Sequence, residues 1–149
     1  MKNDWKNLLV GQKVSLDTNL LIYAVSVTED GRSAIAKELL SILPHHNCVL
    51  TLQALSEFAH VGIRKLGLPA EHVLARVEAW STLFPVINAA TSTLARAIQA
   101  VETHQLAFWD AMLWATAYEA GVALLFSEDF QHNQRIGGVR ILNPFYAET

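Results

Sequence analysis

Hydrophobic residues in this 149-residue chain occur in short continuous runs that alternate with longer stretches of helical spacing. A short apolar run bounded by turn residues is typical of a strand that is buried on both faces of a parallel sheet. Five segments fit this pattern, and we predict strands at 14–16, 48–50, 84–87, 122–126 and 139–142.

Helices are predicted between these strands, where apolar residues recur at intervals of three and four. The clearest is an amphipathic segment that begins at Leu52, continues to Leu66 and ends before Gly67 and Pro69. The predicted helices cover 20–24, 33–43, 52–66, 69–82, 94–101 and 107–120.

The alternation of strands and helices favours an α/β fold, because parallel strands need crossover connections that cover the sheet. We expect a single domain over residues 1–149, with a parallel central sheet of about five strands and helices on both faces. Residues 1–13 precede the first predicted strand, and we describe them as an N-terminal extension.

Composition supports one globular domain, since 52% of the residues are hydrophobic and 17% are charged. The single cysteine, Cys48, excludes an intramolecular disulfide and favours a reducing compartment. The first residues lack the features of a signal peptide, so we expect a cytoplasmic protein. The apolar stretch 107–126 contains Asp110, Glu119 and Gly121, and no membrane role is implied.

The formal net charge is −3, and the lysines and arginines are scattered along the chain. Such a surface does not predict nonspecific capture of a long polyanion. An enzyme that acts on nucleic acid would then depend on bound cations and a local groove to hold the phosphates.

Two acids follow predicted strands directly, at the edge of an α/β sheet where ligands bind. Asp17 comes after the first strand, and Asn19 places a second polar side chain nearby. Asp129 follows the strand at 122–126. Each has an ordinary alternative explanation: Asp17 as the N-cap of a helix, and Asp129 as a turn residue.

Two further acids lie on predicted helices. Asp110 has apolar neighbours at helical spacing, and burial of an unpaired charge there would cost several kcal/mol. Glu57 flanks the apolar face of the helix at 52–66, although a solvent-facing glutamate would be an equally simple interpretation of this residue alone.

All four acids can converge at one edge of the predicted sheet. Clustered carboxylates repel one another, and hard divalent cations such as Mg²⁺ or Mn²⁺ bind carboxylate oxygens and keep them ionised. A site of this kind suits phosphodiester hydrolysis, because a bound ion activates water and stabilises charge on the phosphate. The sequence therefore predicts a metal-dependent nuclease.

Five motifs resemble the PIN domain, in particular the VapC-type toxins of toxin–antitoxin pairs, and they cover nearly the whole chain. They are VSLDTNLLIY at 14–23, QALSEF at 53–58, AFWDAML at 107–113, LFSEDF at 125–130 and GVRILNPF at 138–145. The extension of about thirteen residues is longer than is usual in that family, and Glu128 beside Asp129 complicates the choice of the fourth acid.

The resemblance implies an endoribonuclease that uses Mg²⁺ or Mn²⁺ and acts as the toxin of a type II toxin–antitoxin pair. Its substrate would be single-stranded or looped RNA, and its products would carry 5′-phosphate and 3′-hydroxyl ends. A cognate antitoxin and a homodimer are also implied. The implied roles are metal binding and catalysis for Asp17, Glu57, Asp110 and Asp129, and supporting hydrogen bonds from Asn19 and Ser127.

Other interpretations remain open. A PIN nuclease that processes RNA without an antitoxin and a PIN-like protein that binds without cutting share the same motifs. A haloacid dehalogenase would need an acid where Asn19 stands, and a receiver domain would need an acid pair and a late lysine that we do not find. Tryptophans could stack on bases, but Trp114 lies in the apolar helix, where core packing is favoured.

Overall fold

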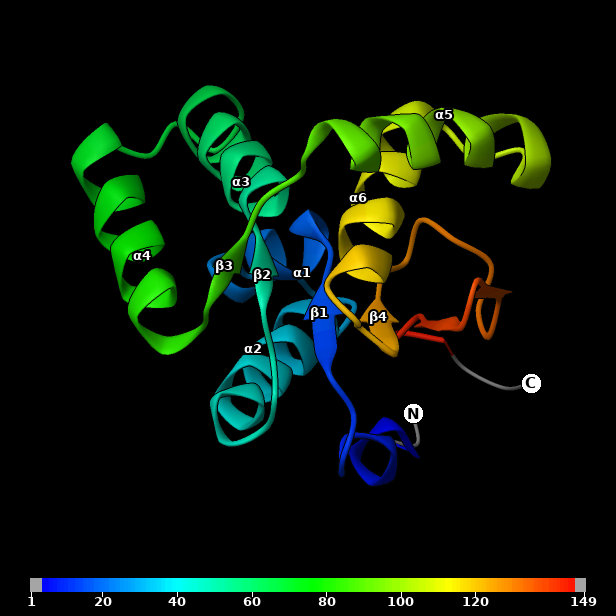
Figure 1. Cartoon of the computed structure of the whole chain (residues 1–149). Helices are drawn as coiled ribbons and strands as arrows, with labels where there is room; N and C mark the ends of the chain where they lie inside the picture. Colours follow the sequence, from blue (N-terminus) through cyan, green and yellow to red (C-terminus); the bar gives the residue numbers. More distant parts are fainter. Residues whose placement is uncertain (1–3, 147–149) are drawn as a thin grey trace.

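The computed structural model describes residues 4–146, and its strands lie side by side at the centre of the molecule (Figure 1). The main sheet has the order β1-β4-β6-β5, in which β1, β4 and β6 are parallel and β5 is antiparallel to β6. Its strands are β1 (Val14–Leu16), β4 (Leu124–Phe126), β6 (Val139–Leu142) and β5 (Arg135–Ile136).

A second parallel pair continues the sheet beyond β1. This pair consists of β2 (Leu50–Thr51) and β3 (Val86–Ile87). A parallel bridge between Val14 and Cys48 places the segment before β2 next to β1. The prediction of an α/β fold with a parallel central sheet is therefore confirmed, except that one strand at the edge, β5, is antiparallel.

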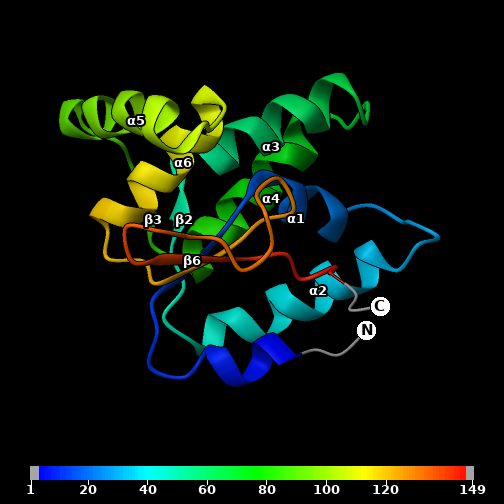
Figure 2. The ribbon, with the colours of Figure 1, turned by 90° about the vertical axis from the view of Figure 1, so that its right-hand side faces the viewer.

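Helices cover both faces of the sheet, as the sequence predicted. They are η1 (Asp4–Leu8), α1 (Thr18–Ala24), α2 (Arg32–Ile42), η2 (Leu43–His45), α3 (Leu52–Arg64), α4 (Ala70–Leu83), α5 (Thr91–His104) and α6 (Phe108–Glu119). Because side chains alternate along a strand, Leu124 and Phe126 join the core formed with α1–α4, whereas Leu125 joins the core formed with α5 and α6. Figure 2 shows α2 and α6 on opposite sides of β6.

Apart from β3 and β4, which each begin two residues later than predicted, the structure differs from the predicted strands at two places. The prediction missed β5, because a two-residue polar–apolar edge strand has no run of buried residues. Gly137 and Gly138 join β5 to β6 with φ values of 56° and 87°, the left-handed backbone that a tight hairpin turn requires. The strand predicted at 48–50 is displaced to 50–51, with only a bridge at Cys48.

The N-terminal extension packs against the sheet over its described part, residues 4–13. The side chain of Trp5 in η1 is buried, and its ring meets that of Phe126 edge-on, with 5.8 Å between centroids. Among residues 4–146, no helix combines the length and the apolar character needed to cross a membrane.

Candidate metal centre

The candidate site lies where β1 and β4 end beside each other. The backbone N–H of Asp17 donates to the carbonyl oxygen of Phe126 at 2.9 Å, which extends the ladder one step beyond the paired residues. Asp17 and Ser127 therefore emerge at the same edge of the sheet. This is the position where ligands bind in open α/β sheets.

Asp17 is buried and serves two structural purposes. Its Oδ1 accepts a hydrogen bond from the backbone N–H of Thr18 at 2.7 Å and so caps α1. Its Oδ2 accepts from the hydroxyl of Ser127 at 2.8 Å. Burial raises the pKa of Asp17 to about 7, the two hydrogen bonds oppose this shift, and the charge of Asp129 adds to it. The N-cap interpretation and a site role are thus compatible.

Asp110 approaches the same place from the first turn of α6. The side chain is only partly exposed, and burial raises its pKa. The negative charges of Asp129 and Glu57 raise it further. Desolvation and like charges together disfavour an ionised Asp110 unless a cation lies nearby.

Asp129 completes the cluster from the loop after β4. Its carboxylate oxygens both accept from the Nδ2 of Asn19 at 3.3 Å, and its backbone N–H donates to the Oγ of Ser127 at 3.1 Å. The adjacent Glu128 is used elsewhere: its two oxygens accept from Tyr23 Oη at 2.6 Å and from Arg32 Nε at 3.2 Å. Of these two neighbouring acids, only Asp129 lines the pocket.

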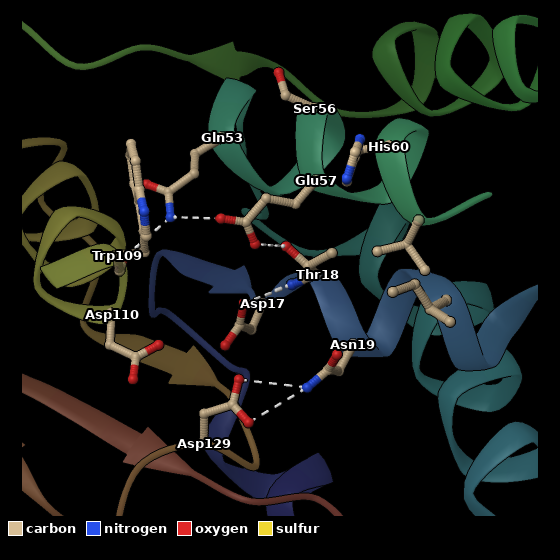
Figure 3. Close-up of a pocket in the computed structure, with 12 residues that line it drawn as sticks. Asp17, Thr18, Asn19, Gln53, Ser56, Glu57, His60, Trp109, Asp110 and Asp129 are labelled. Carbon is tan, nitrogen blue, oxygen red and sulfur yellow. Dashed lines mark hydrogen bonds between the residues drawn. The ribbon is translucent and has the colours of Figure 1, made fainter. Parts of the chain in front are cut away.

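Three carboxylates thus meet in one pocket. One oxygen from each of Asp17, Asp110 and Asp129 lies within 4.8 Å of the other two, and Figure 3 shows the three side chains pointing toward one another. Glu57 lines the same pocket but lies outside this triad. Its carboxylate accepts from Thr18 Oγ1 at 2.9 Å and from Gln53 Nε2 at 3.1 Å.

The chemistry of the pocket fits a divalent cation. The cavity is about 440 Å³, and neither lysine nor arginine lines it within the described residues 4–146. Within the described part of the chain, the triad therefore has no lysine or arginine in its pocket to balance its charge. Carboxylate oxygens in such a cluster are the ligands that hard divalent cations prefer.

Two side chains at the site, Thr18 and Gln53, were not predicted from the sequence, and both donate to Glu57. Trp109, one of the four tryptophans that could stack on bases, stands beside Gln53 at the margin of the pocket (Figure 3). The sequence held a weak signal for Thr18 and Gln53. Thr18 follows Asp17 directly, and Gln53 precedes Glu57 by one helical turn, the spacing at which side chains on a helix meet.

The fold is an α/β sheet with an acidic pocket at the carboxyl ends of its parallel strands. The sequence pattern of the PIN domain family matches residues 14–136. The chain belongs to the PIN domain family. No curated protein matches the sequence.

Several solved structures of the same fold come from toxin–antitoxin systems. A toxin–antitoxin complex from Klebsiella pneumoniae is 24% identical, with a TM-score of 0.64 over 89% of this chain and 98% of that one. A sarcin–ricin-loop-cleaving VapC toxin of Mycobacterium tuberculosis is 19% identical, with a TM-score of 0.63 over 76% and 87%. A DNA-bound VapBC complex from Salmonella typhimurium is 21% identical, with a TM-score of 0.63 over 87% and 96%.

Proposed function

We propose that this protein is a Mg²⁺- or Mn²⁺-dependent endoribonuclease and the toxin of a type II toxin–antitoxin pair. One observation carries the proposal: Asp17, Asp110 and Asp129 converge within 4.8 Å in a pocket without lysine or arginine among the described residues. Membership of the PIN domain family and the fold shared with VapC toxins support the same function.

In the proposed reaction, water adds to phosphorus and the bond to the 3′ oxygen breaks, which leaves a 5′ phosphate and a 3′ hydroxyl. Bound Mg²⁺ or Mn²⁺ would lower the pKa of a water and offset charge on the phosphate. Asp17, Asp110 and Asp129 are the residues that would hold the metal. Glu57, which accepts from Thr18 and Gln53 and lines the same pocket, would accept a proton from the attacking water.

A protein partner is the second part of the proposal. Four structures of the same fold are described as toxin–antitoxin or VapBC complexes. The acidic pocket of this chain would attract a basic side chain of an antitoxin, which would occupy the place of the metal and silence the enzyme.

Cutting of RNA is the direct test of the enzymatic part. We expect purified protein to cut total RNA in Mg²⁺ or Mn²⁺ and to lose this activity in EDTA. Asp17→Asn and Asp110→Asn should each reduce cutting at least 100-fold, an estimate based on the usual size of electrostatic contributions to catalysis. Glu78→Gln, which removes an exposed acid on α4, is the matched control and should cut normally.

The same experiment separates this proposal from a binding protein that does not cut. Such a protein would retain RNA without cleaving it in either metal, and Asp17→Asn would leave binding unchanged. Growth arrest on expression, relieved by a small protein from an adjacent reading frame, would distinguish a toxin from an RNA-processing enzyme that has no antitoxin.

A homodimer is also proposed. Leu94 and Ile98, one turn apart on α5, are 40% and 56% exposed, and apolar side chains left on a surface are often covered by another protein. Light scattering during gel filtration would give the mass in solution. A monomer at all concentrations would reject this part of the proposal without affecting the enzymatic part.

A further inference from the structure

A second pocket of about 470 Å³ adjoins the acidic one along the same edge of the sheet. It lies at the carboxyl ends of β2 and β3, where Thr51 and Ile87 line it, and it extends to Met112 on α6. The two pockets share Gln53, Ser56, Glu57 and Trp109. A ligand in the acidic pocket can therefore continue into the second pocket without leaving the protein surface.

Trp109 stands at the boundary between the two pockets. Trp5, Trp80 and Trp114 are buried, whereas Trp109 is 62% exposed. Its position is nevertheless restrained, because Gln53 Nε2 donates to its carbonyl oxygen at 3.0 Å and its ring meets that of Phe108 edge-on, with centroids 4.9 Å apart. Figure 3 shows Gln53 reaching from α3 between Glu57 and Trp109. The backbone of Trp109 is thus fixed to Gln53, and its indole offers an exposed aromatic face at the boundary of the two pockets.

The lining of the second pocket suits a flat, uncharged group. Leu52, Ile87, Ala89 and Met112 form apolar walls, and Glu57, at the shared edge, is the one charged residue among those of the described chain that line it. A phosphate or a basic peptide would not be favoured in such surroundings. A nucleobase presents an apolar face for stacking and polar atoms only at its edge.

Asn88 gives this pocket a polar group at its rim. Its Oδ1 accepts from the backbone N–H of Ala89 at 2.8 Å, which orients the side-chain amide. The Nδ2 hydrogens then remain available as donors. They match the carbonyl oxygens and ring nitrogens that accept hydrogen bonds at the edges of bases.

We infer that the second pocket binds the base of a nucleotide next to the cut phosphate, with Trp109 as its stacking residue. The inference rests on the proposed nuclease function, and it adds a binding site for one base, which must be unpaired and turned out of the strand to enter. A base in a regular duplex is stacked on its neighbours and could not enter.

Short RNAs with a missing base test this inference. A single-stranded RNA with one cut site is compared with versions in which one nucleotide near the cut is abasic. For the wild type, we expect an abasic nucleotide at one flanking position to raise KM between about 5-fold and 150-fold, the range that the loss of one base–aromatic stack produces. The value of kcat should change little, because base stacking would contribute equally to the bound RNA and to the transition state.

Trp109→Ala should raise KM on intact RNA by a similar factor and should have no further effect on the abasic RNA. Trp109→Phe keeps an aromatic face and should restore most of the affinity. Leu74→Ala, which removes an exposed apolar side chain on α4 outside both pockets, is the matched control and should leave KM unchanged. Thermal stabilisation by Mg²⁺ should be the same in Trp109→Ala as in the wild type.

The inference is overturned if Trp109→Ala leaves KM unchanged, or if its effect multiplies with that of the abasic nucleotide. The first result would assign the pocket to another occupant, such as an apolar side chain of a partner protein.

If the wild type cuts no RNA, the proposed function fails, and base binding is then tested alone by quenching of the fluorescence of RNA that contains 2-aminopurine. Equal quenching by the wild type and Trp109→Ala would reject the stacking role.

Discussion

The hydroxyl of Ser127 donates to Oδ2 of Asp17 across 2.8 Å and thereby links the ends of two neighbouring strands. The Oγ of Ser127 in turn accepts from the backbone N–H of Asp129 at 3.1 Å. One buried hydroxyl therefore orients two acids of the triad. Hydrogen bonds of this kind to metal ligands typically change metal affinity or activity 10-fold to 100-fold when they are removed.

Ser127→Ala is expected to weaken the metal site while the fold persists. Half-saturation for Mg²⁺ in the cleavage reaction should rise about 10-fold to 100-fold. The unpaired N–H of Asp129 should lower the free energy of unfolding by about 1–2 kcal/mol. Ser81→Ala removes a hydroxyl that bonds only within α4, and it should change neither quantity. An unchanged Mg²⁺ dependence in Ser127→Ala would show that the hydroxyl does not position Asp17.

The raised pKa of Asp17 predicts an unusual pH dependence for the metal-free protein. The folded protein holds this proton up to about pH 7, whereas the unfolded chain releases it near pH 4. The folded state therefore binds more protons between these values, and its stability falls as the pH rises from 4 to 7. The loss is on the order of a few kcal/mol, because each pKa unit corresponds to about 1.4 kcal/mol.

Urea denaturation in EDTA at several pH values would measure this effect. Asp17→Asn removes the titrating group, so its stability should vary less over the same interval. Mg²⁺ competes with the proton for Asp17, and we expect stabilisation by the metal to increase as the pH rises through 7. A wild-type protein that becomes steadily more stable from pH 4 to 7 in EDTA would contradict this account.

Asp110 is predicted to lower the stability of the protein when no metal is bound. Burial and the charges of Asp129 and Glu57 all disfavour its ionised form. Asp110→Asn should therefore stabilise the metal-free protein by about 0.5–1 kcal/mol, a modest gain because solvent screens a half-exposed charge. The same variant should lose most of the thermal stabilisation that Mg²⁺ gives to the wild type. Calorimetry with and without Mg²⁺, with Glu78→Gln as the control, would measure both changes.

Much of the fold and part of the site could be predicted from the sequence, because the apolar runs that identify the strands also show which residues follow them. Buried parallel strands require continuous apolar runs, and the residues after them meet at one edge of the sheet. This reasoning placed Asp17 and Asp129 together. The apolar surroundings of Asp110 supplied a second argument, since an acid among apolar residues needs a counter-charge.

The sequence could not predict how deeply each side chain of the site is buried or in which direction it points. Helical spacing shows which face of α3 carries Glu57, but it does not show that Thr18 and Gln53 hold this carboxylate outside the triad. The two acids after β4 are equally polar in sequence, and no strand periodicity extends into that loop to orient them. The second pocket involves residues from α3, α6 and the segment after β3, which only tertiary packing brings together.

The N-terminal extension is predicted to stabilise the strand that leads into the site. Trp5 is buried and packs against Phe126, the last residue of β4. Trp5→Ala should lower the free energy of unfolding by about 3–5 kcal/mol, the usual effect of removing a large buried aromatic side chain. Chemical denaturation would measure the change, and Val10→Ala, at a site that is 77% exposed, should have little effect. A loss below about 1 kcal/mol for Trp5→Ala would mean that the extension contributes little to the fold.

The adjacent acids Glu128 and Asp129 allow a direct comparison between a residue outside the triad and a residue that belongs to it. Glu128 accepts from Tyr23 and Arg32, away from the triad, whereas Asp129 is one of the three clustered carboxylates. Glu128→Gln keeps a hydrogen-bond acceptor for Tyr23 but loses the charge paired with Arg32, so we expect a loss of about 1 kcal/mol in stability and normal cutting of RNA.

Asp129→Asn is expected to show the opposite pattern. It removes one charge from the triad and should reduce cutting of RNA at least 10-fold. The stabilisation by Mg²⁺ should also decrease. The metal-free protein should be as stable as the wild type or more stable. Rates of RNA cleavage and melting temperatures with and without Mg²⁺ would be measured for both variants in parallel. If Glu128→Gln abolished cutting and Asp129→Asn did not, the fourth acid of the site would be Glu128.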